Sequence, residues 1–243
     1  MTTFATPKVT LIAHTAIVPD AIEQRLEIQE GSTDAETLTV YAGRSCYESW
    51  SRPNEKTRED KDYLRRTLFE QGHMSILEHA SATFYLTGVS RALLAEITRH
   101  RHLSFSVRSQ RFVSEEDASI VIPPAARKSK ATVVYGTEDF RDDLDGSLTG
   151  ALKWWAQDVL LDYEEIVEAL QGEGLPRKQA REAARAVLPN MIETRIVVTG
   201  NLRAWHEVIA RRTAPDADAE FQQVAGLIRK ELQRLAPEVF PEP

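Results

Sequence analysis

The chain has 243 residues, of which 42% are hydrophobic and 28% charged, a composition typical of globular proteins with a substantial core. This length fits one large domain, and we expect a single domain over residues 1–243. The formal net charge of −7 argues against a general nucleic-acid-binding protein, because phosphate contacts usually require an excess of basic residues. The single cysteine, Cys46, excludes an internal disulfide framework and a cysteine-rich zinc site.

The hydropathy pattern predicts a cytoplasmic protein with no membrane partner. No apolar run approaches the roughly 18 residues that a membrane-spanning helix needs. Residues 1–20 also lack the basic start and long apolar stretch of a signal peptide.

The first half of the chain predicts two strands and three helices. Gly72 is placed to end one of the helices, and Ser90 is placed to cap another at its amino end. The predicted strands are residues 8–13 and 79–86, and the predicted helices are residues 34–49, 60–71 and 91–101.

The second half predicts mostly helices. Residues 119–122 are expected to form a short strand that Pro123 and Pro124 stop, and residues 125–137 are expected to form a loop. Residues 193–199 (ETRIVVT) are typical of a strand. The predicted helices are residues 148–170, 177–187, 202–212 and 216–235, so helices outnumber strands and the expected class is α+β.

A basic segment, residues 99–111 (RHRHLSFSVRSQR), carries four arginines, two histidines and three serines without an acid. Guanidinium groups match phosphate oxygens in a bidentate fork, and serine hydroxyls can complete such a site. A small phosphorylated ligand is therefore one interpretation. The other is a solvated basic helix end that meets the carboxyl-terminal helix dipole, and the composition alone favours neither.

Two further basic arrays have the same two interpretations. Arg177, Arg181 and Arg185 are spaced four apart and share one face of a helix. Such a stripe is more often a solvated surface than a ligand site. The last array lies at the start and end of a predicted helix and consists of Asn201, Arg203, Arg211 and Arg212.

These residues carry a resemblance to a known family. The pattern Arg-His-Arg, seven residues and a serine is similar to the signature of flavin-dependent thymidylate synthases, and residues 99–101 and Ser109 match it. Other segments resemble the family in the same order, and they are AGRSCYESW (42–50), HMSILEHASATFYLTG (73–88), RKQAREAARAVLPN (177–190) and ETRIVVTGNLRAW (193–205). The likeness is strongest to actinobacterial members and weakest across residues 125–174.

The resemblance implies a helix-rich α+β domain with a central, mostly antiparallel sheet. It also implies a homotetramer with shared active sites, in which FAD-dependent methylation of dUMP to dTMP uses 5,10-methylenetetrahydrofolate as carbon donor and NADPH as reductant. The implied FAD-binding residues are His73, Ser75, Arg99, His100, Arg101, Val107, Asn201, Leu202, Arg203 and Glu207. The implied dUMP-binding residues are Glu96, Arg99, Val107, Arg108, Ser109, Gln110, Arg111, Arg185 and Arg212, and Arg212 is the implied catalytic residue.

Three positions depart from the family pattern. Val107 stands where the family usually has Glu or Gln, Glu207 replaces a usual Asn or His, and Asp216 replaces a usual His. These changes leave two alternative functions open: methylation of UMP or a related pyrimidine nucleotide, and a non-catalytic relative that binds nucleotides or RNA. Cys46 is expected to be a buried structural thiol, and the scattered histidines predict no metal site.

Overall fold

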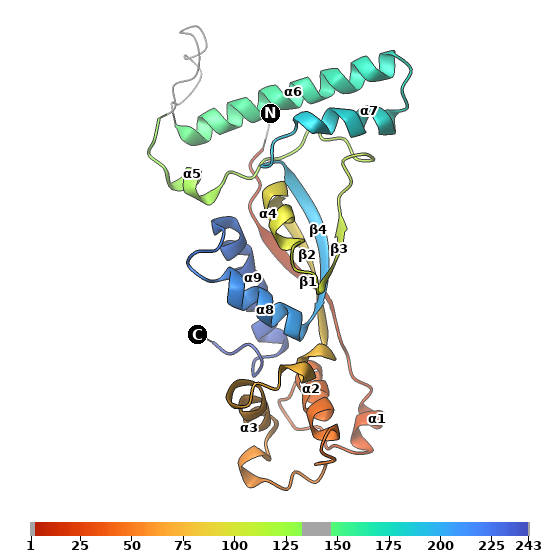
Figure 1. The fold of residues 1–243 in the computed structure, drawn as a ribbon, viewed down its shortest axis with the longest axis vertical. Helices are drawn as coiled ribbons and strands as arrows, with labels where there is room; N and C mark the ends of the chain where they lie inside the picture. Colours follow the sequence, from red (N-terminus) through yellow and green to blue (C-terminus); the bar gives the residue numbers. More distant parts are fainter. Residues whose placement is uncertain (1–2, 133–146, 243) are drawn as a thin grey trace.

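The structure, a computed structural model, describes residues 3–132 and 147–242 (Figure 1). Its centre is a four-stranded antiparallel sheet of order β1-β2-β4-β3. The strands are β1 (Lys8–His14), β2 (Ser81–Ser90), β3 (Leu103–Val107) and β4 (Glu193–Asn201). The predicted α+β class with an antiparallel sheet is confirmed.

The sheet lies between two helical parts along the long axis of the molecule (Figure 1). At one end are α1 (Pro19–Glu23), α2 (Asp34–Ser45), η1 (Glu55–Thr57), α3 (Asp60–Leu64) and η2 (Arg65–Glu70), followed by η3 (Met74–Glu78) on the way to β2. At the other end are α5 (Pro124–Lys128), α6 (Leu148–Gly172), α7 (Arg177–Ala184) and η5 (Arg185–Val187). One helical part thus connects β1 with β2, and the other connects β3 with β4.

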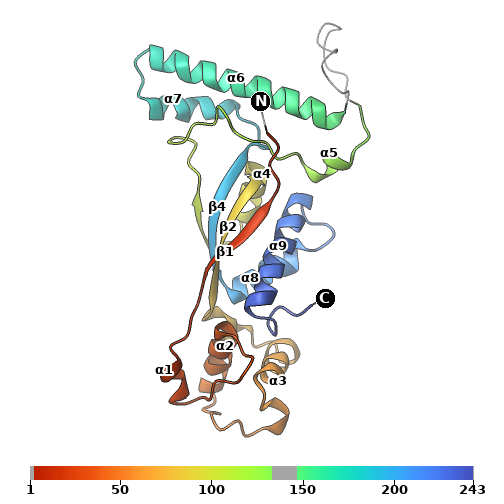
Figure 2. The same cartoon turned by 180° about the vertical axis from the view of Figure 1, so that it is seen from behind.

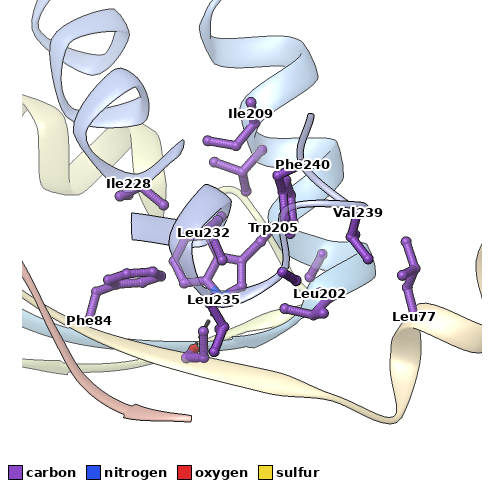
Figure 3. Close-up of a cluster of buried hydrophobic side chains, with 14 of the residues drawn as sticks. Leu77, Phe84, Leu202, Trp205, Ile209, Ile228, Leu232, Leu235, Val239 and Phe240 are labelled. Atoms are coloured by element: carbon purple, nitrogen blue, oxygen red, sulfur yellow. Dashed lines mark hydrogen bonds between the residues drawn. The ribbon is translucent and has the colours of Figure 1, made fainter. Parts of the chain in front are cut away.

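One face of the sheet is covered by α4 (Arg91–Ile97), α8 (Leu202–Arg212) and α9 (Ala219–Leu235). Inward side chains alternate along β2, where Phe84 and Leu86 are fully buried. Trp205 of α8 meets Phe84 edge-on at 5.0 Å between ring centroids, and its Nε1 donates to the carbonyl of Ala82 at 3.1 Å (Figure 3). This packing fixes α8 on the sheet, and α8 carries several of the predicted site residues.

The opposite face of the sheet has no helix over it among the described residues (Figure 2). Its outward side chains include Thr83 and Thr199, which share a hydrogen bond of 2.9 Å across neighbouring strands. Tyr85 and Val197 lie on the same face and are only half-buried.

Most predicted elements are present with small shifts at their ends. The helix predicted at 202–212 is α8, and the one predicted at 148–170 is α6, which continues to Gly172. Ser90 caps α4 by accepting from the backbone N–H of Leu93, and Gly72 ends its helix with φ of 72°. Asp218 caps α9, which therefore begins at Ala219 rather than at 216.

Five predictions differ from the structure. The expected strand at 119–122 is absent, because Ile120 forms only isolated bridges with Phe4 and Ile192. The expected loop at 125–137 begins as the short helix α5, and its residues 133–137 lie outside the described part. The helices predicted at 34–49 and 91–101 end earlier, at Ser45 and Ile97, and the one predicted at 60–71 turns into a π-helix after Leu64.

Strand β3 and helix α1 were not predicted. Strand β3 lies within the basic segment, where serines hide the alternation of Leu103, Phe105 and Val107. It is recognisable only through its partner, because Phe105 pairs with Val198 in the buried centre of β4.

Candidate functional site

The predicted site residues gather at the two ends of β3. Leu103 pairs with Gly200 at one end of this strand, and Val107 pairs with Ile196 at the other. Five residues of antiparallel strand span about 14 Å between the first and last Cα. The residues just before β3 and those just after it therefore form two separate groups within one subunit.

The first group is an interlocked cluster around Arg212, at the carboxyl end of α8. Arg212 Nε donates to His100 Nε2 at 3.0 Å, and its Nη1 donates to Glu96 at 3.1 Å. The guanidinium carbon lies 4.7 Å from the ring centroid of Phe221. Because only Nε and Nη1 are used, Nη2 makes no hydrogen bond with any described residue and is available to a ligand.

His100 is held in its neutral form by this cluster. Its Nε2 accepts from Arg212, which requires the proton to be on Nδ1. Burial lowers the pKa of His100, and the positive charges of Arg212 and Arg211 lower it further, while Glu207 and Glu96 oppose the shift. Arg99, by contrast, is exposed, and its Nη1 lies 4.0 Å from a carboxylate oxygen of Glu96.

A cavity of about 200 Å³ opens at the amino end of α8, and its lining residue Glu207 is close enough to His100 to act on the pKa of that ring. Asn201 caps α8 through its side-chain oxygen, which accepts from the backbone N–H of Ala204 at 2.8 Å. Arg203 forms an ion pair with Glu78 of η3. The cavity is lined by Glu78, His102, Asn201, Arg203, Ala204 and Glu207, and it brings together three of the predicted flavin residues.

The second group follows β3 and faces α7. Arg111 Nε lies 2.6 Å from a carboxylate oxygen of Glu182, and Arg181 donates to the carbonyl of Phe112 at 2.7 Å. Gln110 is buried, and its Nε2 has no hydrogen-bond partner among the described residues. A buried amide N–H without a partner costs free energy, so a ligand that offers an acceptor to Gln110 Nε2 would be favoured here.

Arg108 is already engaged within the subunit. It forms an ion pair with the buried carboxylate of Glu115 at 3.2 Å and donates to the carbonyl of Ser114 at 2.9 Å. Burial raises the pKa of Glu115, and Arg108 opposes that rise. Arg108 also lines a cavity of about 510 Å³ on the uncovered sheet face, together with Glu116, Asp117, Glu193 and Arg195, a mixed charge unlike that of a nucleotide site.

Several of the remaining predicted residues are exposed or half-buried. His73 and Ser75 are exposed at the start of η3, and Arg101 and Arg185 are also exposed. Ser109 is half-buried after β3.

Two predicted residues are taken up by packing. The side chain of Leu202 is fully buried and its backbone N–H donates to Ala80, so neither is presented to a ligand. Val107 packs against the main core.

The prediction for Cys46 is wrong. Its side chain is exposed, and its Sγ donates to the carbonyl of Ala42 at 3.4 Å. The residue follows the last turn of α2, which ends earlier than expected and leaves the thiol outside the core.

Sequence reasoning missed Glu78 and His102 as lining residues. Both stand inside segments that carry the family resemblance, but only the approach of η3 to α8 shows that they share a cavity with Asn201.

Comparisons with known proteins place the chain in a family. It matches the family described as "Thymidylate synthase complementing protein" over residues 28–238. It is 46% identical to a flavin-dependent thymidylate synthase of Mycobacteroides abscessus, over 86% of this chain and 81% of the relative. A probable flavin-dependent thymidylate synthase of Mycobacterium phage L5 is 44% identical, over 97% of this chain and 96% of the relative.

The chain belongs to the flavin-dependent thymidylate synthase family. It is thus an enzyme of this type, and the resemblance to actinobacterial members is confirmed by mycobacterial relatives at 44–46% identity. The fold agrees: thymidylate synthase X from Helicobacter pylori, solved with FAD and dUMP, superposes with a TM-score of 0.60 at 19% identity, over 98% of this chain and 100% of that one.

The residues around the cavity at α8 fit one part of a flavin. The cavity at α8 offers the donors Asn201 and Arg203 at a helix amino end, a common place for phosphate groups. Its 200 Å³ is below the 300–1,000 Å³ of typical ligand pockets, so this cavity alone is too small for a whole flavin. No group of three or more potential metal ligands occurs among the described residues, and no described helix is long and apolar enough to cross a membrane.

Proposed function

We propose that this enzyme converts dUMP to dTMP, with 5,10-methylenetetrahydrofolate as carbon donor and NADPH as reductant. The observation that carries the proposal is the Glu96–His100–Arg212 cluster, whose Arg212 ends the same helix, α8, that begins at the cavity of Asn201 and Arg203. A bound FAD would supply the redox chemistry. Arg212 would supply a positive charge beside the uracil ring.

Uracil is a poor nucleophile at carbon 5 unless electron density is pushed into the ring. A fixed cation beside the ring stabilises the negative charge that develops there during carbon–carbon bond formation. Glu96, neutral His100 and the ring of Phe221 hold Arg212 in one place, so little reorganisation is needed when that charge appears. The free Nη2 edge is the part of Arg212 that we assign to the uracil ring.

We also propose that the active sites are shared between subunits of a homotetramer. The predicted dUMP residues occupy both ends of β3, about 14 Å apart along the strand. No helix covers one face of the sheet among the described residues, which leaves that face available to a second subunit. Association would bring Arg111 and Gln110 of one subunit toward Arg212 of another.

The test is dTMP formation by the purified protein. With FAD, the folate, NADPH and dUMP present, the expected result is dTMP, detected by chromatography, together with a yellow, flavin-loaded protein. A competition assay with equal amounts of dUMP and UMP shows which nucleotide the enzyme accepts. Methylated UMP in place of dTMP would mean that UMP, and not dUMP, is the substrate. A cytoplasmic location stays a prediction that fractionation of the host would check.

A further inference from the structure

A second cavity, of about 240 Å³, lies in the helical part at the amino-terminal end of the molecule, between α2 and the π-helix η2. Its wall contains three basic residues, Arg44, Arg66 and His73, and the aromatic rings of Tyr47 and Tyr63. The remaining lining residues are polar or small, namely Ser49, Pro53, Asn54, Thr57, Thr67 and Gln71, and no carboxylate is among the described lining residues.

Arg44 is buried there without an anionic partner. Its Nη2 donates to the carbonyl of Thr57 at 2.7 Å, its Nη1 donates to that of Ser49 at 3.3 Å, and its guanidinium lies 4.4 Å from the ring centroid of Tyr63. Its side chain forms no ion pair within the described chain, and its Nε has no hydrogen-bond partner there. A buried charge is costly unless an opposite charge lies near it. A ligand anion in this cavity would supply that charge.

Nearby acids do not fill the role. The carboxylate of Asp60 is taken by Arg52 at 2.5 Å, and both side chains are buried. Arg52 also donates to the carbonyls of Arg58 and Glu27, so it ties the loop of residues 46–53 to the segments before α3 and after α1. Arg66 also lines the cavity and is exposed, and its side chain has neither a hydrogen bond nor an ion pair with any described residue.

The wall is built from two unusual backbone segments. Glu48 and Arg52 have φ of 47° and 51°, and they are the only non-glycine residues with positive φ among those that the structure describes. Both lie in the loop of residues 46–53, and Arg66 lies in the π-helix η2. Left-handed non-glycine residues and π-helices both concentrate at functional sites.

The helix η3 connects this cavity with the one at α8. His73, immediately before η3, lines the cavity at Arg44, and Glu78, the last residue of η3, lines the cavity at Asn201. Six residues at the 2.0 Å rise of a 3₁₀ helix place the two about 10 Å apart. One extended co-substrate can therefore reach both cavities.

We propose that the cavity between α2 and η2 binds the anionic end of a flat, aromatic co-substrate, whose reacting end lies at the flavin cavity. Arg66 contacts the anion directly, buried Arg44 attracts it, and the Tyr47 ring stacks on its flat part. This inference rests on the proposed function, in which two co-substrates have such ends: the glutamate carboxylates of the folate and the 2′-phosphate of NADPH.

The experiment measures the binding of isolated anionic ends. Calorimetry on the flavin-loaded protein would use p-aminobenzoyl-glutamate and adenosine 2′,5′-bisphosphate as separate probes. We expect one of them to bind, and Arg66→Gln to weaken it by about tenfold or more, the usual effect of losing a hydrogen bond to a charged group. Arg65→Gln is the matched control, since Arg65 is the exposed neighbour that does not line the cavity.

The pattern of losses identifies the source of the anion. A loss confined to p-aminobenzoyl-glutamate assigns the cavity to the folate, and one confined to the bisphosphate assigns it to NADPH. Three outcomes would overturn the proposal. Neither probe binds, or Arg65→Gln weakens probe binding as much as Arg66→Gln does, or Arg66→Gln weakens the binding of dUMP or flavin and leaves probe binding unchanged. Probe binding by a protein that forms no dTMP would instead remove the proposed reaction and leave this cavity assigned.

Discussion

Arg212 carries a permanent charge, and its side chain is held in one position. Three groups from two other helices and the loop after α4 hold it: Glu96, His100 and Phe221. Its neighbour Arg211 is exposed on the same helix turn and has no such partners. The two arginines therefore form a natural pair for comparing a positioned cation with a solvated one.

Arg212→Ala should reduce dTMP formation by roughly 100- to 1000-fold, the usual loss when one preorganised donor to a developing charge is removed. Arg212→Lys should restore only part of the rate, because an ammonium lacks the planar fork. The measurements are turnover, flavin absorbance and circular dichroism, with Arg211→Ala as control. Near-normal turnover of folded Arg212→Ala would show that the role is misassigned.

His100 should make stability depend on pH. Its pKa is lowered, chiefly by burial and then by Arg212 and Arg211, so the unfolded chain binds its proton more readily than the native state. The contribution to the free energy of unfolding is complete above the ordinary histidine pKa of about 6.5 and is lost as the pH falls through the lowered value.

Urea denaturation from pH 8 to pH 5 checks this expectation. The difference in unfolding free energy between the parent and His100→Asn should narrow as the pH falls below about 6.5. Burial also lowers the pKa of His206, so this residue should add a similar dependence of the unfolding free energy on pH. The double variant His100→Asn, His206→Asn should lack both contributions. A pH-independent difference between the parent and His100→Asn would contradict the lowered pKa.

The basic segment and the ends of α8 could be singled out from the sequence, because they have a distinctive pattern. The partners of those residues within the fold could not. Arg108 was expected to bind dUMP, yet a buried carboxylate, Glu115, forms an ion pair with it. Cys46 looked like a core thiol, yet it lies beyond the end of α2. In both cases the outcome depends on what the fold brings near, which a local pattern does not contain.

Among the strands, β2 contains a bulge where its pairing with β4 shifts between Leu86 and Val89. Gly88 sits in this bulge with φ of 65°, and its N–H donates to Glu193 at 3.0 Å. A Cβ added there would lie 1.9 Å from the carbonyl oxygen of Thr6. The bulge thus requires glycine for both conformation and space.

Gly88→Ala should therefore lower the free energy of unfolding, by about 1–3 kcal/mol from backbone strain alone. Gly226→Ala is the matched control on α9, where an added Cβ meets nothing within 4 Å. It should raise stability by about 0.4–1 kcal/mol, because alanine reduces the freedom of the unfolded chain. Urea midpoints measure both, and a Gly88→Ala protein as stable as the parent would mean that the bulge relaxes without strain.

At the scale of the whole molecule, the separation of the two groups at the ends of β3 predicts that flavin binding requires assembly. A single 27.4 kDa subunit provides a cavity of only about 200 Å³ at α8. We expect the flavin-loaded species to be a tetramer, and dilution that releases subunits to release flavin as well. Light scattering combined with flavin absorbance measures both, and a stable flavin-loaded monomer would rule out shared sites.

The sequence by itself determined the α+β class, the ends of α8, the capping of α4 and the family, since each depends on local periodicity or on a pattern of neighbouring residues. Only the tertiary structure decided that β3 is a strand, because its identity comes from pairing with the buried β4. It also decided that Arg44 is a buried cation and that Glu78 meets Arg203. Such outcomes depend on contacts between segments far apart in the chain, and their energies come from burial and charge that no local stretch of sequence specifies.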